Sequence, residues 1–215
     1  MTVPQTLLLR RDVLRAGLQA LVIDLPETAM AKLLAYVDLL VKWNGTYNLT
    51  AIRNGDEMVT QHLLDSLSIL VYLKAVKNLA DIGSGAGLPG IPLAITRPDL
   101  QVTLIDSVQK KSAFQQQAKI DLGLGNLRVY SGRVEDFMPQ EKFDAVTARA
   151  FSNLSNLASS AGRLLNQGGR IYAMKGVLPQ QEIDALPADW HVASTEPLQV
   201  PGLNAERHLL TLERN

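Results

Sequence analysis

The feature that most constrains the fold of this chain is the glycine-rich loop 83–87, of sequence GSGAG, which follows the apolar stretch 79–82. Glycines let the backbone turn tightly and approach a ligand closely, and the helix expected over 91–98 would offer free N–H groups at its start. Asp106 ends the next apolar stretch, where an acidic side chain can accept hydrogen bonds from ribose hydroxyls. The loop therefore predicts a ligand that contains a nucleoside.

Two cofactor classes fit this loop. The spacing of Gly85, Gly87 and Gly90 matches the fingerprint of dinucleotide-binding proteins, in which the loop holds a pyrophosphate. Asp81 stands just before Gly83, however, and a carboxylate beside a pyrophosphate would be repelled. S-adenosylmethionine has no phosphate and carries a positive charge, so that it tolerates this carboxylate. The pattern favours S-adenosylmethionine at Gly83 and Gly85; a nicotinamide or flavin cofactor, or a purely structural turn, are the alternatives.

The hydrophobic period divides the chain into two parts. Residues 1–75 show apolar positions at helical spacing and predict a helical cap, whereas residues 76–215 alternate β-type runs with helical segments or loops. The first five β-type runs have the pattern of a mainly parallel sheet with helices on both faces, and the last two could form a hairpin. The seven runs are 79–83, 102–107, 127–132, 143–148, 169–175, 191–195 and 208–214.

Inside the cap, Pro26 begins an amphipathic helix over 26–43, and Asn44-Gly45 predicts the turn after it. A third helix carries His62 and Asp65, which could form a proton relay or a metal pair, although we favour a histidine that packs the cap against the domain. Three residues near the turn could grip a base but are expected instead to fix the turn: Trp43, Tyr47 and Asn48.

The composition excludes several kinds of site. The chain has no cysteine, and its three histidines are scattered, so we expect no disulfide, no cysteine nucleophile and no metal. Lysine and arginine number 21, as do aspartate and glutamate, which argues against a global positive field, yet residues 108–178 carry ten basic against five acidic side chains. These charges form either a local basic face or an ordinary solvated surface. The apolar runs are too short to span a bilayer, and the N-terminus lacks the charge order of a secretory signal, so we expect a cytoplasmic protein.

Several segments together resemble one known family. In order along the chain they are WNGTYNLTAIRNGDEMVTQHLLDSLSIL, DIGSGAGLPGIPLAI, LIDSVQKKSAFQ, SGRVEDF, FDAVTARAFSNL, YAMKG and ERHLL. They resemble the bacterial 16S ribosomal RNA guanine-N7 methyltransferases, a family also called glucose-inhibited division protein B. The resemblance runs from about residue 30 to residue 212.

This resemblance implies a class I S-adenosylmethionine-dependent methyltransferase fold: an α/β, Rossmann-like domain with a mainly parallel seven-stranded sheet whose last strand is antiparallel. It also implies methyl transfer to N7 of a guanine, guanosine 527 in standard numbering, in the 530 loop of 16S rRNA in the small ribosomal subunit. The cofactor contacts that it places on this sequence are Gly83, Leu88, Val134, Glu135 and Arg149, with Asp106 as the ribose partner.

Methylation at N7 needs no general base, because this nitrogen already has a free lone pair. It needs the lone pair to be aligned with the methyl–sulfur bond of the cofactor. N7 lies on the buried edge of an A-form helix, so the target base must be unpaired or splayed out. Lys110, Arg133 and Lys175 each follow a presumed strand or lie in a loop near one, and they are expected to contact RNA or the transition state, unless they are ordinary surface cations. Arg149 is expected nearer the cofactor.

Two other functions stay open from the residues alone. A methyltransferase that acts on a small molecule or a protein would suit the neutral charge, and a nucleotide- or RNA-binding module without catalysis would also need the glycine loop. We expect a monomer whose partner is 16S rRNA in the small subunit.

Overall fold

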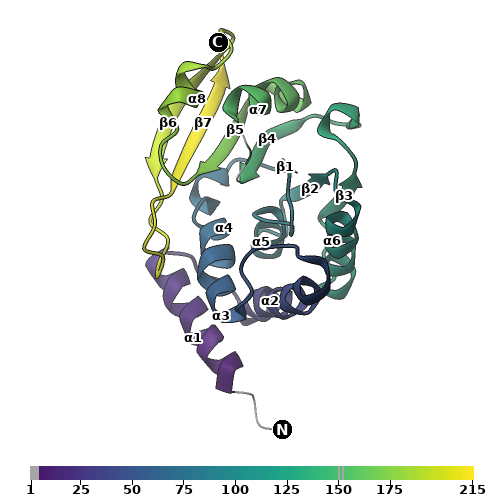
Figure 1. Ribbon diagram of the computed structural model, residues 1–215, viewed down its shortest axis with the longest axis vertical. Coiled ribbons are helices and arrows are strands. Elements are labelled where there is room, and N and C mark those ends of the chain that lie inside the picture. The colour runs from purple at the N-terminus through teal and green to yellow at the C-terminus, as the bar shows by residue number, and fades with distance from the viewer. Residues whose placement is uncertain (1–4, 150, 152) are drawn as a thin grey trace.

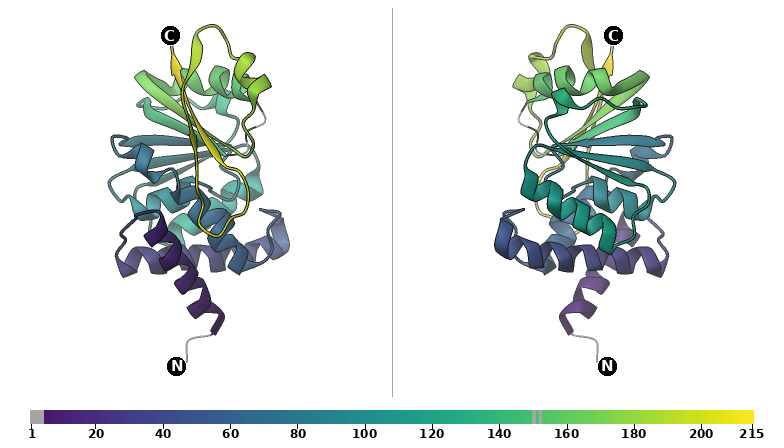
Figure 2. Two further views of the ribbon diagram at one scale, coloured as in Figure 1. Left: turned by 90° about the vertical axis from the view of Figure 1, so that its left-hand side faces the viewer. Right: turned by 90° about the vertical axis from the view of Figure 1, so that its right-hand side faces the viewer.

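The computed structural model describes residues 5–149, 151 and 153–215. They form a seven-stranded sheet with helices on both faces, and a helical N-terminal region that packs against one face (Figure 1). Figure 2 shows the purple and blue helices of that region on one side of the sheet and the green helix that follows β4 on the other.

The sheet has the order β3-β2-β1-β4-β5-β7-β6. Its ladders are parallel from β3 to β5, whereas β7 runs antiparallel to both β5 and β6. The predicted sheet, with its antiparallel last strand and the pairing of the last two strands, is confirmed. The strands are β1 (Asn78–Ile82), β2 (Gln101–Asp106), β3 (Leu127–Ser131), β4 (Phe143–Arg149), β5 (Leu165–Lys175), β6 (Trp190–Pro197) and β7 (His208–Arg214).

Helical elements precede the sheet and connect its strands. In the N-terminal region they are α1 (Gln5–Ala20), α2 (Glu27–Tyr47), α3 (Gly55–Met58), the π-helix η1 (Val59–Leu64), α4 (Asp65–Leu67) and η2 (Leu70–Leu73). Between strands they are α5 (Gly90–Thr96), α6 (Gln109–Asp121), η3 (Val134–Asp136), α7 (Leu154–Ala161), η4 (Gly162–Leu164) and α8 (Gln180–Asp184). None of the helices described is long and apolar enough to cross a lipid bilayer.

The strand order reverses its direction of growth between β1 and β4, which are neighbours in the sheet. In open α/β sheets this switch point leaves a crevice at the carboxyl ends of the strands, where ligands bind. The glycine-rich loop 83–87 begins directly after β1 and therefore lies at the switch point.

Two apolar clusters cover the two faces of the sheet, because neighbouring residues of a strand point to opposite sides. Leu79 belongs to the cluster that also holds the helices of the N-terminal region and α6, while Ala80 belongs to the cluster under α7. Leu33 and Tyr36 of α2 are fully buried in the first cluster. The N-terminal helices therefore share one core with the sheet.

The turn predicted at Asn44-Gly45 is wrong. Helix α2 continues to Tyr47, and Asn48 ends it in the left-handed conformation with a φ of 49°. The Asn44 side chain instead donates to the carbonyl of Ile52 and accepts from the N–H of Thr50. Asn44 thus lies within α2, and its side chain fixes the segment that follows the helix. Spacing along the sequence does not show such a contact.

Shortening Leu33 tests whether the cap and the sheet unfold together. Leu33→Ala should lower the free energy of unfolding by about 2–5 kcal/mol because it opens a cavity in the shared core. Val177→Ala is the control, since this residue is 73% exposed and the change should alter the stability by less than about 0.5 kcal/mol. Urea unfolding followed by circular dichroism and by the fluorescence of Trp43 and Trp190 should show one transition; two separate transitions would contradict the shared core.

Candidate functional site

The glycine-rich loop has a backbone that only glycine adopts readily. Gly83, Gly85 and Gly87 have φ angles of 65°, 59° and 86°, in the left-handed region that side chains disfavour. A Cβ atom on Gly87 would also lie 2.3 Å from the side chain of Ile91. The conformation of the loop, and not only its closeness to a ligand, explains these glycines.

Two buried side chains hold the loop in place. Asp106 accepts from the N–H of Gly85 at 2.8 Å through Oδ2 and from the N–H of Val108 at 2.9 Å through Oδ1. Gln115 of α6 donates to the hydroxyl of Ser84 at 2.9 Å and to the carbonyl of Gly85 at 2.8 Å. Each Asp106 oxygen has a second lone pair, so the carboxylate can still accept from a ligand hydroxyl.

A cleft of about 230 Å³ opens beside the loop, at the carboxyl ends of β1, β2 and β3. It brings together four residues that were predicted to bind the cofactor, and Arg133 as well. The lining residues are Ile82, Gly83, Ile105, Asp106, Ser107, Gly132, Arg133, Val134, Glu135 and Phe151. Gly132 and Phe151 were missed, although Gly132 ends the predicted β-type run 127–132.

Leu88 and Arg149, also predicted as cofactor contacts, are not among the lining residues of this cleft. Leu88 is buried in the core cluster behind the loop. Gly85 contributes its N–H to Asp106 and lies at the turn of the loop. Their contacts to a cofactor therefore stay predictions.

Asp81 is a buried carboxylate behind the loop. Its Oδ2 accepts from the N–H of Gly90, the first residue of α5, at 2.8 Å. The sequence predicted free N–H groups at the start of this helix, but the N–H of Gly90 already has a partner. Within the described part of the chain, no group donates to Oδ1. Burial raises the pKa of Asp81 to about 7, against the opposing effects of the Gly90 N–H and of Arg149. A positively charged ligand nearby would favour the ionised form.

A second buried carboxylate, Asp65, joins the helical region to the carboxyl edge of the sheet. Arg149 at the end of β4 donates to Oδ2 at 2.9 Å and to the carbonyl of Gln61 at 3.2 Å. Arg207, just before β7, donates to Oδ1 at 2.9 Å. One carboxylate therefore orients two guanidinium groups, which leaves a net positive charge here. Arg207 was missed by sequence reasoning, although the segment ERHLL contains it.

His62 is buried within the helical region, where both of its ring nitrogens have partners. Its Nδ1 lies 3.0 Å from the carbonyl of Gln61 and its Nε2 lies 2.9 Å from the hydroxyl of Thr50. Burial and Arg149 lower the pKa of His62 to about 4, which keeps the ring neutral at pH 7. Across the residues that the structure describes, no three potential ligands converge to hold a metal ion.

The three predicted RNA-contacting cations differ in their surroundings. Arg133 lies at the rim of the cleft with a 72% exposed side chain, and Lys110 at the start of α6 is exposed too. Lys175, by contrast, is 10% exposed and donates to the Glu182 carboxylate at 2.8 Å and to the carbonyl of Phe151 at 3.0 Å. Its charge is therefore largely neutralised by Glu182.

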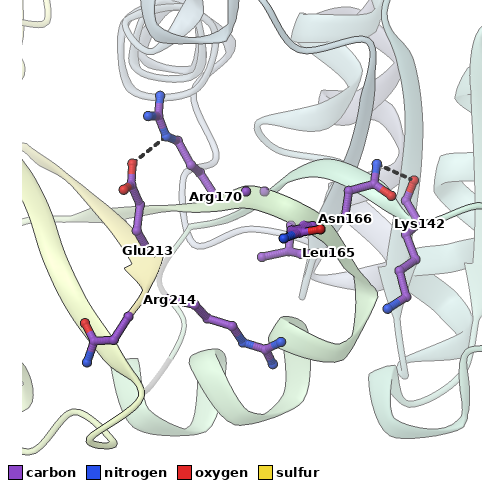
Figure 3. Close-up of a pocket in the computed structure, with 10 residues that line it drawn as sticks. Lys142, Leu165, Asn166, Arg170, Glu213 and Arg214 are labelled. Carbon is purple, nitrogen blue, oxygen red and sulfur yellow. Dashed lines mark hydrogen bonds and ion pairs between the residues drawn. The ribbon is translucent and has the colours of Figure 1, made fainter.

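A larger hollow of about 590 Å³ lies at the opposite edge of the sheet (Figure 3). Lys142 precedes β4, and Asn166 and Arg170 belong to the first half of β5, so this hollow lies at the amino ends of the parallel strands. Arg170 pairs with Glu213 at 2.6 Å. No residue that the sequence singled out lines it.

Comparison with known proteins identifies the family. The family model described as rRNA small subunit methyltransferase G (GidB) matches residues 29–210. The chain belongs to this family. A member from Azoarcus sp. (strain BH72), named ribosomal RNA small subunit methyltransferase G, is 56% identical over 92% of this chain and 93% of its own length. A namesake from Neisseria meningitidis serogroup C is 53% identical over 95% of this chain and 99% of its own.

Solved structures share the class I methyltransferase fold with this family member. The mitomycin 7-O-methyltransferase MmcR superposes with a TM-score of 0.60 at 12% identity, over 76% of this chain and 56% of that one. TrmN from Thermus thermophilus does so with a TM-score of 0.54 at 17% identity, over 73% of this chain and 53% of that one. At these identities the likeness concerns the fold, which is the one predicted.

Removing the Asp65 carboxylate tests how much it contributes to the stability of the fold. Asp65→Ala should lower the free energy of unfolding by about 3–5 kcal/mol, because two guanidinium groups lose their buried partner. Asp38→Ala removes an ion pair to Arg10 from a side chain that is 55% exposed, and should cost about 1 kcal/mol or less. Equal losses of unfolding free energy for the two variants in chemical denaturation would show that the buried Asp65 pairs contribute no more than an exposed ion pair.

Proposed function

We propose that this family member transfers a methyl group from S-adenosylmethionine to N7 of a guanine, guanosine 527, in the 530 loop of 16S rRNA. The observation that carries the proposal is the family match over residues 29–210. The cleft supports it independently, because Gly83, Asp106, Val134 and Glu135 meet there from separate segments of the chain.

The residues of the site fit S-adenosylmethionine better than a dinucleotide. Asp106 lies at the end of β2 with lone pairs for ribose hydroxyls. In the described part of the chain no group donates to Oδ1 of buried Asp81, so this carboxylate suits a cation behind the loop and would oppose a pyrophosphate. When bound, the cofactor would supply a methyl group on a positively charged sulfur; transfer of that methyl to the N7 lone pair would leave a neutral thioether and a positively charged guanine ring.

The chain itself has to bind, orient and exclude water, because the N7 lone pair needs no prior loss of a proton. Neutral His62, with both nitrogens occupied, is accordingly not required as a base. Asp65 fixes Arg149 and Arg207 at the carboxyl edge of the sheet. Arg149 is proposed to face the cofactor there, and Arg207 to meet O6 or phosphates of the target.

Arg133, at the rim of the cleft, and Lys110, at the start of α6, are proposed as direct RNA contacts because both are exposed, although Arg133 also pairs with Glu135 at 3.4 Å. Lys175 is proposed to act in its pair with Glu182, which ties the end of β5 to α8. We also propose that the enzyme works as a monomer in the cytoplasm, away from membranes and without a metal, because its proposed substrate is ribosomal RNA.

The decisive test uses a strain that lacks the gene. Digested 16S rRNA from that strain should lack N7-methylguanosine at position 527 by mass analysis, and the wild-type gene should restore it. Gly83→Val should fail to restore it, because the left-handed backbone disfavours a β-branched residue and the new side chain would point toward Phe151 across the cleft.

Gly123→Val is the matched control for backbone strain. Gly123 has a φ of 61°, close to that of Gly83, but nothing lies within 4 Å of an added Cβ. This variant should restore the methyl group. If Gly83→Val restores it equally well, the cofactor does not bind at the loop; if the deletion strain keeps the mark, a small molecule or a protein becomes the better substrate.

Asp81 should make cofactor binding depend on pH. A pKa of about 7 means that the free carboxyl is largely protonated below pH 7, and a cationic ligand binds best when it is ionised. Affinity for S-adenosylmethionine should therefore rise between about pH 6 and 8, with proton release on binding. Calorimetry in two buffers of different ionisation enthalpy measures this release, and Asp81→Asn should abolish the part due to Asp81. An unchanged release in that variant would contradict the assignment.

A further inference from the structure

One contact runs from the helical cap to the glycine-rich loop. Tyr36, in the middle of α2, is fully buried, and its hydroxyl donates to the carbonyl of Ala86 at 2.7 Å. Its ring packs against Phe114 of α6, with the ring centres 6.1 Å apart. Burial raises the pKa of Tyr36 far above its ordinary value, so the hydroxyl keeps its proton and stays a donor.

The loop needs such partners because its glycines allow many conformations. Gly83, Gly85 and Gly87 favour no single backbone state on their own, and a polar group left unpaired inside the protein costs free energy. Asp106 holds the N–H of Gly85 from the end of β2, and Gln115 holds its carbonyl from α6.

Tyr36 completes this set from a third direction. Ala86 is buried, and its carbonyl accepts the Tyr36 hydroxyl. The loop is thus held from β2, from α6 and from α2, and the last of these belongs to the helical region that precedes the methyltransferase domain.

We propose that Tyr36 is a positioning residue for cofactor binding, which holds the loop from the helical cap in the conformation that accepts the ligand. The inference rests on the proposed cofactor site at this loop. Without the hydroxyl, the loop would spend part of its time in conformations that do not bind the cofactor. The apparent affinity for the cofactor would fall in proportion to the remaining population of the binding conformation. The helical cap is then part of the cofactor site, although none of its described residues lines the cleft.

The test is Tyr36→Phe, which keeps the ring packing, beside Tyr172→Phe as a matched control. Tyr172 of β5 is also a buried tyrosine whose hydroxyl donates to a backbone carbonyl, that of Tyr72, at 3.2 Å. Calorimetry with S-adenosylmethionine should show about tenfold weaker binding for Tyr36→Phe, as expected for one lost hydrogen bond to a buried group, and unchanged binding for Tyr172→Phe. In turnover, the KM for S-adenosylmethionine should rise while kcat and the KM for RNA stay the same.

Hydrogen exchange of the ligand-free proteins gives a second reading that does not need the cofactor. The amides of Gly87 and Leu88, which donate to the carbonyl of Ser84, should exchange faster in Tyr36→Phe than in Tyr172→Phe. Wild-type affinity and exchange in Tyr36→Phe, or equal losses in both variants, would overturn the inference. A wild-type protein that binds no S-adenosylmethionine would instead overturn the proposed cofactor site, and this inference with it.

Discussion

The left-handed backbone of the glycine-rich loop is the constraint on which the arrangement of the site depends, because other elements must hold it in place. Three glycines turn the chain sharply at the carboxyl end of β1, which gives a conformation that is open to a ligand but poorly fixed by itself. The loop is held by side chains that are remote in sequence: Asp106 and Gln115 from the following βα unit, and Tyr36 from the cap. The core that joins the cap to the sheet therefore also shapes the cleft.

The helical region also positions charged side chains at the end of β4, the strand next to β1. Asp65 comes from the helical region, yet it orients Arg149 of β4 and Arg207 before β7. One carboxylate for two guanidinium groups leaves positive charge directed at the edge where a nucleic acid would lie. A protein with no net charge can thus present a basic site, because the local arrangement and not the total decides the field.

The sequence predicted those features that depend on local pattern. Seven β-type runs, the loop and Asp106 follow from hydrophobic period and glycine chemistry, and the structure places them as expected. Features that depend on contacts between distant residues did not follow. The bond from Tyr36 to Ala86, the partnership of Lys175 with Glu182 and the orientation of Arg207 by Asp65 have no signature in spacing. The continuation of α2 through Asn44-Gly45 belongs here too, because Thr50 and Ile52 satisfy the Asn44 side chain.

The central claim, methylation of ribosomal RNA at guanine N7, is tested most directly by transfer of labelled methyl to purified substrate. Small-subunit particles or 16S RNA from a strain without this enzyme are incubated with the protein and S-adenosylmethionine that carries a labelled methyl group. We expect incorporation at one nucleotide, position 527, recovered as N7-methylguanosine. Label in no form of the RNA, or label on another atom or nucleotide, would contradict it.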